Sequence, residues 1–404
     1  MMKFRIQREN FIKPLEQISG SVGTNQKEPI TQNVLMKIVP NDPTGPIKDA
    51  EYKMFMICTD TEIELVSEVG LFGEVEQGAI TVEAKKLVTI IKSLPEGCFI
   101  YIEEAPDKKS ITLSTERNKF SLSTLPAEQF PEIEILASSY SLKIKASTLL
   151  EMMKTTSFAI PQENYRVALK GMCFNIRQDR GSKRDLDIYT SDAHRANIQR
   201  AELEEDCVFP EDFTGRNSFI LPKKTVSEVI RLLNEFSKDK SFLDSVIELF
   251  VGRTCFRTEI NGVTVISCLI DSDYPNILMI VPNNCNRVLT LDRESFKNSL
   301  ERVKILCNTL NNAVELIVVN STITIKAKNS LHEEAVEHII AEYEGDDFSL
   351  AYKADYLIDI CKNMTAKKIK ISMTTNSNSA KVEAVAGEGE PVSQACYVVS
   401  RIVL

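Results

Sequence analysis

The sequence has no tryptophan and only three histidines, and its ten cysteines never form a CxxC pair. Cysteines without such spacing indicate neither a zinc knuckle nor a disulfide framework. Two of the histidines, His332 and His338, stand six positions apart in HEEAVEH. The zinc motif HExxH places its histidines at i and i+4, on adjacent turns of one helix. We therefore expect reduced thiols and no metal site.

Motifs that carry catalysis or nucleotide binding are also missing. The sequence has no Gly-x-x-x-x-Gly-Lys-Ser/Thr phosphate loop, no Gly-x-Gly-x-x-Gly turn and no Gly-x-Ser-x-Gly elbow. Carboxylate pairs such as Glu103–Glu104 and Asp346–Asp347 lie in polar stretches, where solvated charge is the simpler interpretation. We expect a protein with no catalytic residue and no cofactor.

Long apolar runs and positive net charge are absent as well. No run approaches the roughly 20 apolar residues of a membrane span, and the start MMKFRIQREN has no apolar leader segment. These features predict a soluble cytoplasmic protein. The formal net charge of -9 argues against a protein that binds nucleic acid over its whole surface, because phosphate binding requires positive charge. Any contact with DNA must be local.

A diverged internal repeat divides the chain of 404 residues. A strand that runs into an amphipathic helix begins at Met2, Tyr140 and Arg287. A second strand–helix segment begins at Ile80, Phe219 and Leu350. A strand then closes each unit, in FSLSTLPAEQFPEI, TVISCLIDSDYPNI and ACYVVSRIVL. The pattern predicts three similar α+β domains of two helices and antiparallel sheets each, with boundaries 1–138, 139–282 and 283–404.

Shorter patterns fill in each predicted domain. Alternating apolar residues predict strands in Phe55–Val66, Ser110–Ser114, Ile247–Thr258 and Val314–Ala327. Polar segments predict surface loops at 40–52, 177–185 and 235–245.

Positive charge gathers on the predicted helices, which are Arg8–Ser21, Glu83–Leu94, Lys145–Ser157, Lys223–Phe236, Asp292–Cys307 and Lys353–Met364. They contain 16 Lys and Arg but 11 Asp and Glu, in a chain that is otherwise acidic. Their periodicity places the basic residues opposite the apolar stripe, at Lys85, Lys92, Lys224, Arg231, Arg293, Lys297 and Lys304. Solvated helix faces often carry lysine in any case. The recurrence in three repeats favours a basic lining that attracts phosphate without reading bases.

The sequence resembles a known family, the bacterial DNA polymerase III beta clamps, from its first predicted strand to its last residue. The resemblance is carried, in order, by MKFRIQRENFIKPLEQISG, FSLSTLPAEQFP, TSDAHR, DYPN with the following VP, and YVVSRIVL. It implies a homodimer that closes head to tail as a six-domain ring, with helices lining duplex DNA and sheets outside. It also implies a processivity factor that slides without sequence specificity.

The resemblance implies three sets of site residues. A pocket between the second and third domains would bind short peptide motifs of replicative and other DNA polymerases, the clamp loader and repair proteins, through Arg166, Leu169, Ser191, Ala193, His194, Arg195, Ala196, Pro275, Ile280, Val398, Ser400, Arg401 and Ile402. The dimer seam would join Phe120 to Ile305 and Leu306, with Arg117 and Lys119 facing Glu333, Glu334 and Glu337. Lys154, Lys223, Gln26 and Lys27 complete the predicted DNA-facing set.

The sequence departs from the family pattern at Ala196, Ser400 and Arg401, where relatives more often have larger apolar residues and a proline. We expect a shallower, more polar pocket that loses about 1 to 3 kcal/mol of apolar contact. Gln26 and Lys27 stand where relatives often have an arginine. Two other interpretations remain open: a clamp-like scaffold outside replication, and an enzyme of unrecognised type that uses the same cleft.

Overall fold

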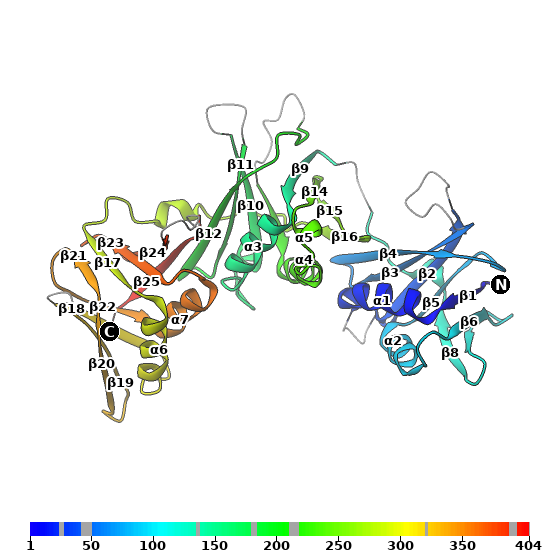
Figure 1. Cartoon of the computed structure of the whole chain (residues 1–404), viewed down its shortest axis with the longest axis horizontal. Helices are drawn as coiled ribbons and strands as arrows, with labels where there is room; N and C mark the ends of the chain where they lie inside the picture. The colour runs from blue at the N-terminus through cyan, green and yellow to red at the C-terminus, as the bar shows by residue number, and fades with distance from the viewer. Residues whose placement is uncertain are drawn as a thin grey trace. The chain divides into compact units, whose positions relative to one another are not determined.

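The computed structural model describes the chain except for residues 24–27, 42–50, 135–137, 179–183, 210–217, 320–321, 388–393 and 404. The chain forms two compact units. Unit 1 comprises residues 1–146, 206–213 and 227–269, and unit 2 comprises residues 147–205, 214–226 and 270–404. Each unit has its own large antiparallel sheet (Figure 1). Most of the predicted loop 40–52, part of the loop 177–185, and both Gln26 and Lys27 lie outside the described residues.

Each long helix follows directly on a strand, as the repeat predicts. In the first predicted domain these pairs are β1 (Lys3–Gln7) with α1 (Arg8–Ile18), and β5 (Gly78–Glu83) with α2 (Ala84–Ser93). In the second they are β9 (Tyr140–Lys145) with α3 (Ala146–Ser157), and β13 (Ser218–Pro222) with α4 (Lys223–Glu235). In the third they are β17 (Arg287–Asp292) with α6 (Arg293–Lys304), and β22 (Phe348–Lys353) with α7 (Ala354–Asn363). The six predicted helices are confirmed, with ends that shift by up to three residues.

One backbone hydrogen bond recurs in all three repeats. The first residue of the first helix donates its N–H to a carbonyl that lies after the second helix: Arg8 to Cys98 at 3.0 Å, Ala146 to Ser245 at 2.9 Å and Arg293 to Lys367 at 2.9 Å. The three repeats therefore share their local geometry as well as their sequence pattern.

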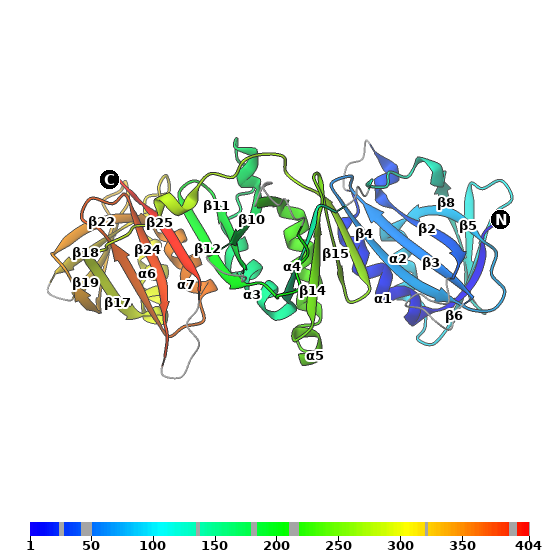
Figure 2. The same ribbon diagram turned by 90° about the horizontal axis from the view of Figure 1, so that it is seen from above.

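Twelve strands form the sheet of unit 1, in the order β1-β6-β7-β8-β5-β2-β3-β4-β16-β15-β14-β9. Figure 2 shows β2, β3 and β4 side by side within it. The sheet passes from the first predicted domain to the second where β4 pairs with β16. The strands not yet given are β2 (Asn33–Pro40), β3 (Tyr52–Thr59), β4 (Ile63–Leu71), β6 (Phe99–Glu104), β7 (Ser110–Ser114), β8 (Lys119–Leu125), β14 (Val246–Val251), β15 (Cys255–Ile260) and β16 (Val263–Cys268).

The sheet of unit 2 follows the path β13-β10-β11-β12-β25-β22-β18-β19-β20, and β17, β21, β23 and β24 extend it from β25. It passes from the second predicted domain to the third where β12 pairs with β25. Its remaining strands are β10 (Gly171–Gln178), β11 (Arg184–Ser191), β12 (Arg195–Glu202), β18 (Ala313–Val319), β19 (Thr322–Lys328), β20 (Glu334–Ile340), β21 (Glu342–Glu344), β23 (Lys368–Met373), β24 (Ser379–Val385) and β25 (Cys396–Ile402).

These two sheets correct the predicted strands in detail. The run Ser110–Ser114 is β7, but Phe55–Val66, Ile247–Thr258 and Val314–Ala327 each span parts of two antiparallel strands and the connection between them. Period-2 alternation continues across a tight turn, so it does not mark where one strand ends. Because the sheets cross the predicted boundaries 1–138, 139–282 and 283–404, the two units divide the middle domain, and the boundaries stay predictions.

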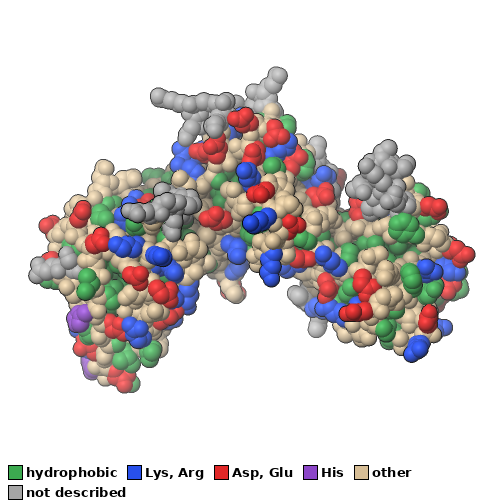
Figure 3. All heavy atoms as spheres, in the orientation of Figure 1, with side chains coloured by type: hydrophobic (Ala, Val, Ile, Leu, Met, Phe, Trp, Pro, Cys, Tyr) green, Lys and Arg blue, Asp and Glu red, His purple; other side chains and the backbone are tan. Residues whose placement is uncertain are grey.

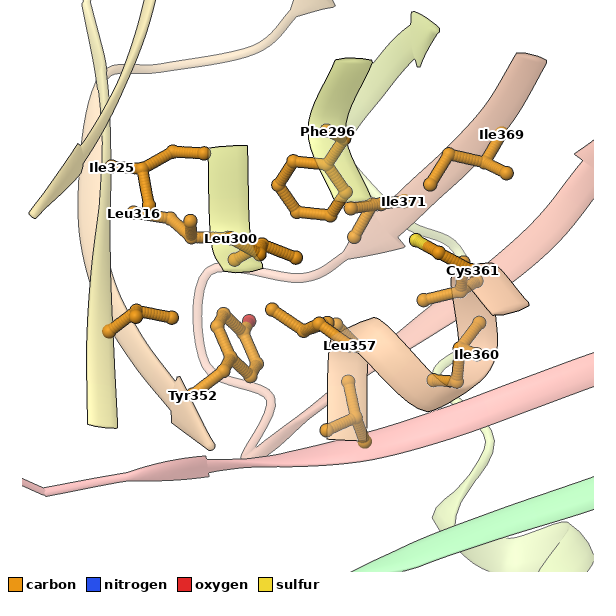
Figure 4. Close-up of a cluster of buried hydrophobic side chains, with 14 of the residues drawn as sticks. Phe296, Leu300, Leu316, Ile325, Tyr352, Leu357, Ile360, Cys361, Ile369 and Ile371 are labelled. Atoms are coloured by element: carbon orange, nitrogen blue, oxygen red, sulfur yellow. The ribbon is translucent and has the colours of Figure 1, made fainter. Parts of the chain in front are cut away.

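Apolar side chains from helices and strands fill the core of the third domain. Figure 4 shows Phe296 and Leu300 of α6 and Leu357 of α7 pointing toward strand residues such as Tyr352 and Ile371. All five are at most 2% exposed. Burial of this kind contributes about 1.5 to 3 kcal/mol per large side chain. It also fixes which face of each helix is left for solvent or a ligand.

The segment 235–245 is wrong as a predicted loop, because it contains a short helix, α5 (Lys240–Leu243). The Asp239 carboxylate caps it by accepting hydrogen bonds from the N–H groups of Ser241 at 2.9 Å and Phe242 at 3.4 Å. Within the described ranges, every helix of the chain is too short or too polar to cross a bilayer.

Candidate functional site

The helices carry their basic side chains on the face opposite the core. On α2, Lys85 and Lys92 are exposed whereas Leu87 and Ile91 are fully buried. The same division holds on α6, where Lys297 and Lys304 are half-buried opposite Phe296, Leu300 and Val303. On α4, Lys223, Lys224 and Arg231 are half-buried opposite Val226, Val229 and Leu233, and Lys154 is exposed on α3. Amphipathic periodicity therefore placed these residues correctly on their helices.

With their observed bounds the six long helices carry 14 Lys and Arg against 9 Asp and Glu, so they remain positive in an acidic chain. Figure 3 shows Lys and Arg lying among Asp and Glu over the face that it draws. The positive excess is thus a property of particular elements. This pattern suits local, non-specific attraction to phosphate.

Two of the predicted DNA-facing residues, Arg293 and Arg231, donate hydrogen bonds within the protein. The Arg293 guanidinium donates to the carbonyls of Cys361 and Ala366, at 2.8 Å each, and so caps the end of α7. Arg8 does the same for α2, donating to the carbonyls of Ile91 and Lys92 at 3.0 Å each. Arg231 of α4 donates to Glu228 at 2.9 Å and also to the carbonyl of Gln17 on α1.

Several predicted lysines also have partners in the chain. Lys92 pairs with Glu16 at 2.5 Å, Lys297 pairs with Glu294 at 2.5 Å, and Lys304 pairs with Asp355. Lys223 donates to the carbonyl of Ile160 at 3.2 Å. Lys85 is exposed and makes no ion pair with a described residue. Lys85 is therefore the predicted DNA-facing cation that the described contacts leave most available.

The predicted peptide pocket draws on four segments of unit 2. Arg166 and Leu169 belong to the 3-10 turn η4 (Val167–Lys170) and the residue before it, and Ile280 ends a second turn, η5 (Ile277–Ile280). Ser191 ends β11, Ala193 and His194 form the turn that follows, and Arg195 and Ala196 begin β12. Val398, Ser400, Arg401 and Ile402 lie on β25, and Pro275 precedes η5.

Main-chain and apolar contacts join these segments. Ala196 of β12 stands opposite Val398 of β25, and the Ser400 N–H donates to the His194 carbonyl at 2.9 Å. Ser379 of β24 donates to the Ile280 carbonyl at 2.8 Å. A buried apolar cluster underlies the region and is formed by Ala168, Cys173, Tyr189, Ala196, Ile198, Ile220, Ile277 and Val398. The four segments η4, the β11–β12 hairpin, η5 and β25 therefore contribute to one apolar floor, in which Ala196 and Val398 are predicted residues.

The residues that depart from the family pattern are placed differently from one another. Ala196 is fully buried in the floor, so its small side chain removes bulk below the surface and not at the rim. Ser400 has the same strand parity as Val398, whereas Arg401 alternates to the other face of β25, opposite Tyr352 on β22. Alternation thus separates Arg401 from the other predicted β25 residues.

Exposed apolar side chains beside this floor were not predicted. Tyr165 is 83% exposed and Met279 is 82% exposed, and they neighbour the predicted residues Arg166 and Ile280. Val403, directly after Ile402, is 89% exposed. Single exposed apolar side chains are common on protein surfaces, so these three are candidates for contact with a partner only because they adjoin predicted site residues. In the sequence they have no periodic signal, because they lie in short turns and at a strand end.

The Arg195 side chain is the centre of a polar cluster in unit 2 and is 11% exposed. Its guanidinium donates to Asp192 at 3.1 Å, to Asp359 of α7 at 2.7 Å and to the carbonyl of Phe158 at 3.1 Å. It also lies over the rings of Tyr356 at 4.5 Å and Phe158 at 5.2 Å. Burial and nearby Asp192 raise the pKa of Tyr356 to about 12. We call Arg195, Asp192, Asp359, Tyr356 and Phe158 the Arg195 cluster.

Half of the predicted seam residues lie on two strands, β8 and β20, that have one bonded neighbour along most of their length. β8 pairs with β7 and reaches β5 only at its last two residues, and β20 pairs with β19 alone among the described strands. Both strands alternate exposed and half-buried residues along their whole length. An edge of this kind presents unpaired N–H and C=O groups to another chain. Lys119 and Phe120 begin β8, just after Arg117, and Glu334 and Glu337 lie on β20.

The predicted acidic seam residues already have partners within the chain. Arg302 of α6 donates twice to the Glu337 carboxylate, at 2.5 and 2.6 Å, and lowers the pKa of Glu337. Glu334 pairs with Lys326, and Glu333 accepts from the Asn329 amide at 2.5 Å. Ile305, at the end of α6, is 78% exposed, and Leu306 is half-buried. A partner strand here would meet carboxylates that already have partners within the chain.

Metal chemistry has no visible support. No group of three or more His, Cys, Asp or Glu side chains among the described residues could hold a metal ion.

Comparison with known proteins gives a consistent match along the chain. Models of the DNA polymerase III beta subunit match in order: its N-terminal domain at residues 2–135, its central domain at 143–276 and its C-terminal domain at 279–391. The beta sliding clamp of Vibrio cholerae is 30% identical over 384 residues, which cover 95% of this chain and 96% of that protein. The beta sliding clamp of Pseudomonas aeruginosa is 30% identical over 381 residues, which cover 94% and 95%.

A solved structure extends the match to three dimensions. The crystal structure of the Pseudomonas aeruginosa DNA polymerase III subunit beta bound to griselimycin has a TM-score of 0.84 and 29% identity, with 100% of both chains covered. Likeness over the full length accounts for three similar α+β domains in this chain.

Proposed function

This chain belongs to the DNA polymerase III beta subunit family, the beta sliding clamps, and from that membership we propose that two copies close head to tail into a ring around duplex DNA. The protein is a sliding clamp, the processivity factor of a bacterial replicative DNA polymerase. One observation carries this function above the others: all three family domains occur in order over nearly the whole chain. A ring needs every domain, so the complete set matters more than any one motif.

The basic helix faces would line the ring. Weak, sequence-independent contacts to phosphate let a protein slide, and closure around the duplex prevents it from leaving. Lys85 of α2 and Lys154 of α3 are exposed and suited to this role. Six further predicted residues would add a positive field, although their side chains also bind within the chain: Lys92, Lys223, Arg231, Arg293, Lys297 and Lys304.

The ring would close where β8 of one copy meets β20 of the other. β20 pairs on one side only, and β8 is unpaired on one side over most of its length. An interface that joins two different surfaces can close into a ring. Ile305, Leu306 and Phe120 would supply apolar contact, while Arg117 and Lys119 would face Glu333, Glu334 and Glu337.

The floor shared by η4, the β11–β12 hairpin, η5 and β25 would bind partners. We propose that short peptide motifs of replicative and other DNA polymerases, of the clamp loader and of repair proteins bind there. The exposed apolar residues Tyr165, Met279 and Val403 beside it would be covered in such complexes. A Pseudomonas aeruginosa relative is described bound to griselimycin, and we propose that this chain binds griselimycin too.

Catalysis is not part of the proposed role. A clamp acts by tethering a polymerase, and the chain would need neither a catalytic residue nor a cofactor. Because it would act on the bacterial chromosome, we place it in the cytoplasm.

Peptide binding tests the partner site. A fluorescently labelled peptide from the clamp-binding segment of the same organism's replicative polymerase should bind the purified protein, and unlabelled griselimycin should displace it. Ile280→Asp, at a residue that is 43% exposed, should abolish binding, whereas Val246→Asp, at an apolar residue of β14 that is 48% exposed, should not. Equal loss from both variants, or no binding by the wild type, would contradict the proposed site.

The runner-up function is a clamp-like scaffold outside replication. The departures at Ala196, Ser400 and Arg401 favour it, since they alter the predicted partner site. Loading onto DNA by the organism's own clamp loader, followed by processive synthesis, would rule it out.

A further inference from the structure

Arg195 uses three of its five N–H donors within the chain. A guanidinium has five N–H donors on three nitrogens, and each nitrogen of Arg195 already donates within the chain. The group also has two aromatic neighbours, Tyr356 at 4.5 Å and Phe158 at 5.2 Å. With the side chain 11% exposed, a peptide could reach only its margin.

The partners of Arg195 come from three different parts of unit 2. Asp192 belongs to the turn between β11 and β12, Phe158 directly follows α3, and Asp359 and Tyr356 lie three positions apart on one face of α7. Asp359 is 164 residues from Arg195 in the chain. One side chain therefore holds the hairpin, the end of α3 and the third-domain helix α7 together.

The backbone of Arg195 belongs to the floor of the proposed partner site. Its N–H donates to Asp192 at 2.9 Å, and its carbonyl accepts from the Ser191 hydroxyl at 2.7 Å. The neighbouring His194 carbonyl accepts from the Ser400 N–H at 2.9 Å, and the next residue, Ala196, stands opposite Val398. A shift of the guanidinium would consequently shift the hairpin against β25.

We propose that Arg195 is a positioning residue, which holds the β11–β12 hairpin to α7 through Asp359 and thereby sets the geometry of the partner site without contacting the peptide. This inference rests on the proposed partner site. It assigns a role to Asp359, a residue outside the predicted site. It also implies that lysine cannot fully replace Arg195. The planar guanidinium donates to three acceptors at once, whereas an ammonium is a single point charge.

Asp359→Asn separates positioning from direct contact. The substitution keeps the shape of the side chain and removes the charge that faces Arg195. The matched control is Asp355→Asn on the same helix, because Asp355 pairs with Lys304 and not with Arg195. Two readouts are needed: amide hydrogen exchange at Arg195 and Ser400 in the full chain without ligand, and affinity for the labelled polymerase peptide by fluorescence anisotropy.

Asp359→Asn and Arg195→Met should each speed exchange at both amides and weaken the peptide by about tenfold, within the range usual for coupled sites. The double variant should be no weaker than either single variant, and Arg195→Lys should recover only part of the affinity. Asp355→Asn should match the wild type in both readouts. Melting curves recorded for each variant confirm that the measurements are made on folded protein.

Unchanged exchange in Asp359→Asn would overturn the positioning role. Loss of affinity in Arg195→Met alone would also overturn it, because that result indicates direct contact with the peptide. Failure of the wild type to bind the peptide would instead overturn the proposed partner site, while the exchange data would still decide whether Arg195 holds the hairpin.

Discussion

Basic residues of this chain fall into two groups that the sequence does not distinguish. Arg293, the first residue of α6, donates hydrogen bonds to the carbonyls of Cys361 and Ala366. Arg8 occupies the equivalent position in the first repeat. Lys85 also carries a positive charge, but it is exposed and makes no ion pair with a described residue. Periodicity placed Lys85 and Arg293 on polar helix faces. It could not reveal that one side chain caps a neighbouring helix.

Substitution of Arg293 should therefore affect thermal stability, whereas substitution of Lys85 should affect DNA binding. Arg293→Ala removes two charge-assisted hydrogen bonds, each contributing about 1.5 to 3 kcal/mol, and should lower the melting temperature clearly. Lys85→Ala should leave melting unchanged and reduce the slope of log affinity for duplex DNA against log salt by about 1. Thermal unfolding and salt titration of DNA binding measure both effects. An Arg293→Ala variant with an unchanged melting temperature would contradict the capping role.

Glu64 of β4 is a buried carboxyl, 4% exposed, that accepts a hydrogen bond from the Ile133 N–H at 3.0 Å. Burial, assisted by the nearby Glu132 carboxylate, raises the pKa of Glu64 from 4.5 to about 7. Ile133 and Glu132 also line a cavity of about 280 Å³, together with Thr61, Pro131, Glu134, Thr254, Cys255 and Cys268. The charged form of Glu64 is thus disfavoured in the folded protein.

The raised pKa of Glu64 gives stability a definite pH dependence. Its favourable contribution is full below the unfolded value of 4.5 and is lost as pH rises through about 7. The lost free energy amounts to about 3 kcal/mol.

Glu64→Gln should therefore stabilise the protein at pH 8 by up to that amount and much less at pH 5. Thermal unfolding at both values measures this. Glu134→Gln, at an exposed residue of the same segment, is the control and should show no such difference. If Glu64→Gln is no more stable than the wild type at pH 8, then burial does not raise the pKa of Glu64 as described.

Strand-to-helix units were the part of the fold that sequence predicted best. Each of the six units combines two periods, and each helix has several turns of apolar spacing. The short helix α5 has four residues, too few for a periodic signal, and depends on the Asp239 cap. Strand ends were missed wherever alternation continued through a turn. A local sequence pattern therefore predicts a helix only when the helix spans several turns.

The proposed seam between β8 of one copy and β20 of the other can be tested by a substitution at Ile305. Ile305, at the end of α6, is 78% exposed, so an aspartate there should cost the single chain little but should be desolvated unfavourably in the proposed seam. Ile305→Asp should shift the protein from dimer to monomer in sedimentation velocity, with an unchanged melting temperature for the monomer fold. Val246→Asp, in the middle domain, should remain dimeric. A dimeric Ile305→Asp variant would contradict this seam.

At the scale of the whole molecule, both sheets continue across predicted domain boundaries, at β4 with β16 and at β12 with β25. Sequence reasoning predicted three domains from the repeat but not these pairings, because they join strands that are remote in the chain. The same limit applies to the Arg195 cluster, whose ion pair links residues 164 positions apart. The pocket and seam residues followed only from resemblance to a family, whereas helix periodicity indicated most of the DNA-facing residues. The contacts around all of them required the structure.

The central claim is that topology, and not affinity, holds this protein on DNA. It predicts that clamps loaded onto nicked circular DNA stay bound at a salt concentration that screens ordinary phosphate contacts, and are lost when the circle is cut. Size-exclusion chromatography of the loaded DNA before and after linearisation measures retention directly. Retention on the circle with loss after cutting is the predicted result. Equal loss from circular and linear DNA, for a protein that is dimeric in solution, would contradict a sliding ring.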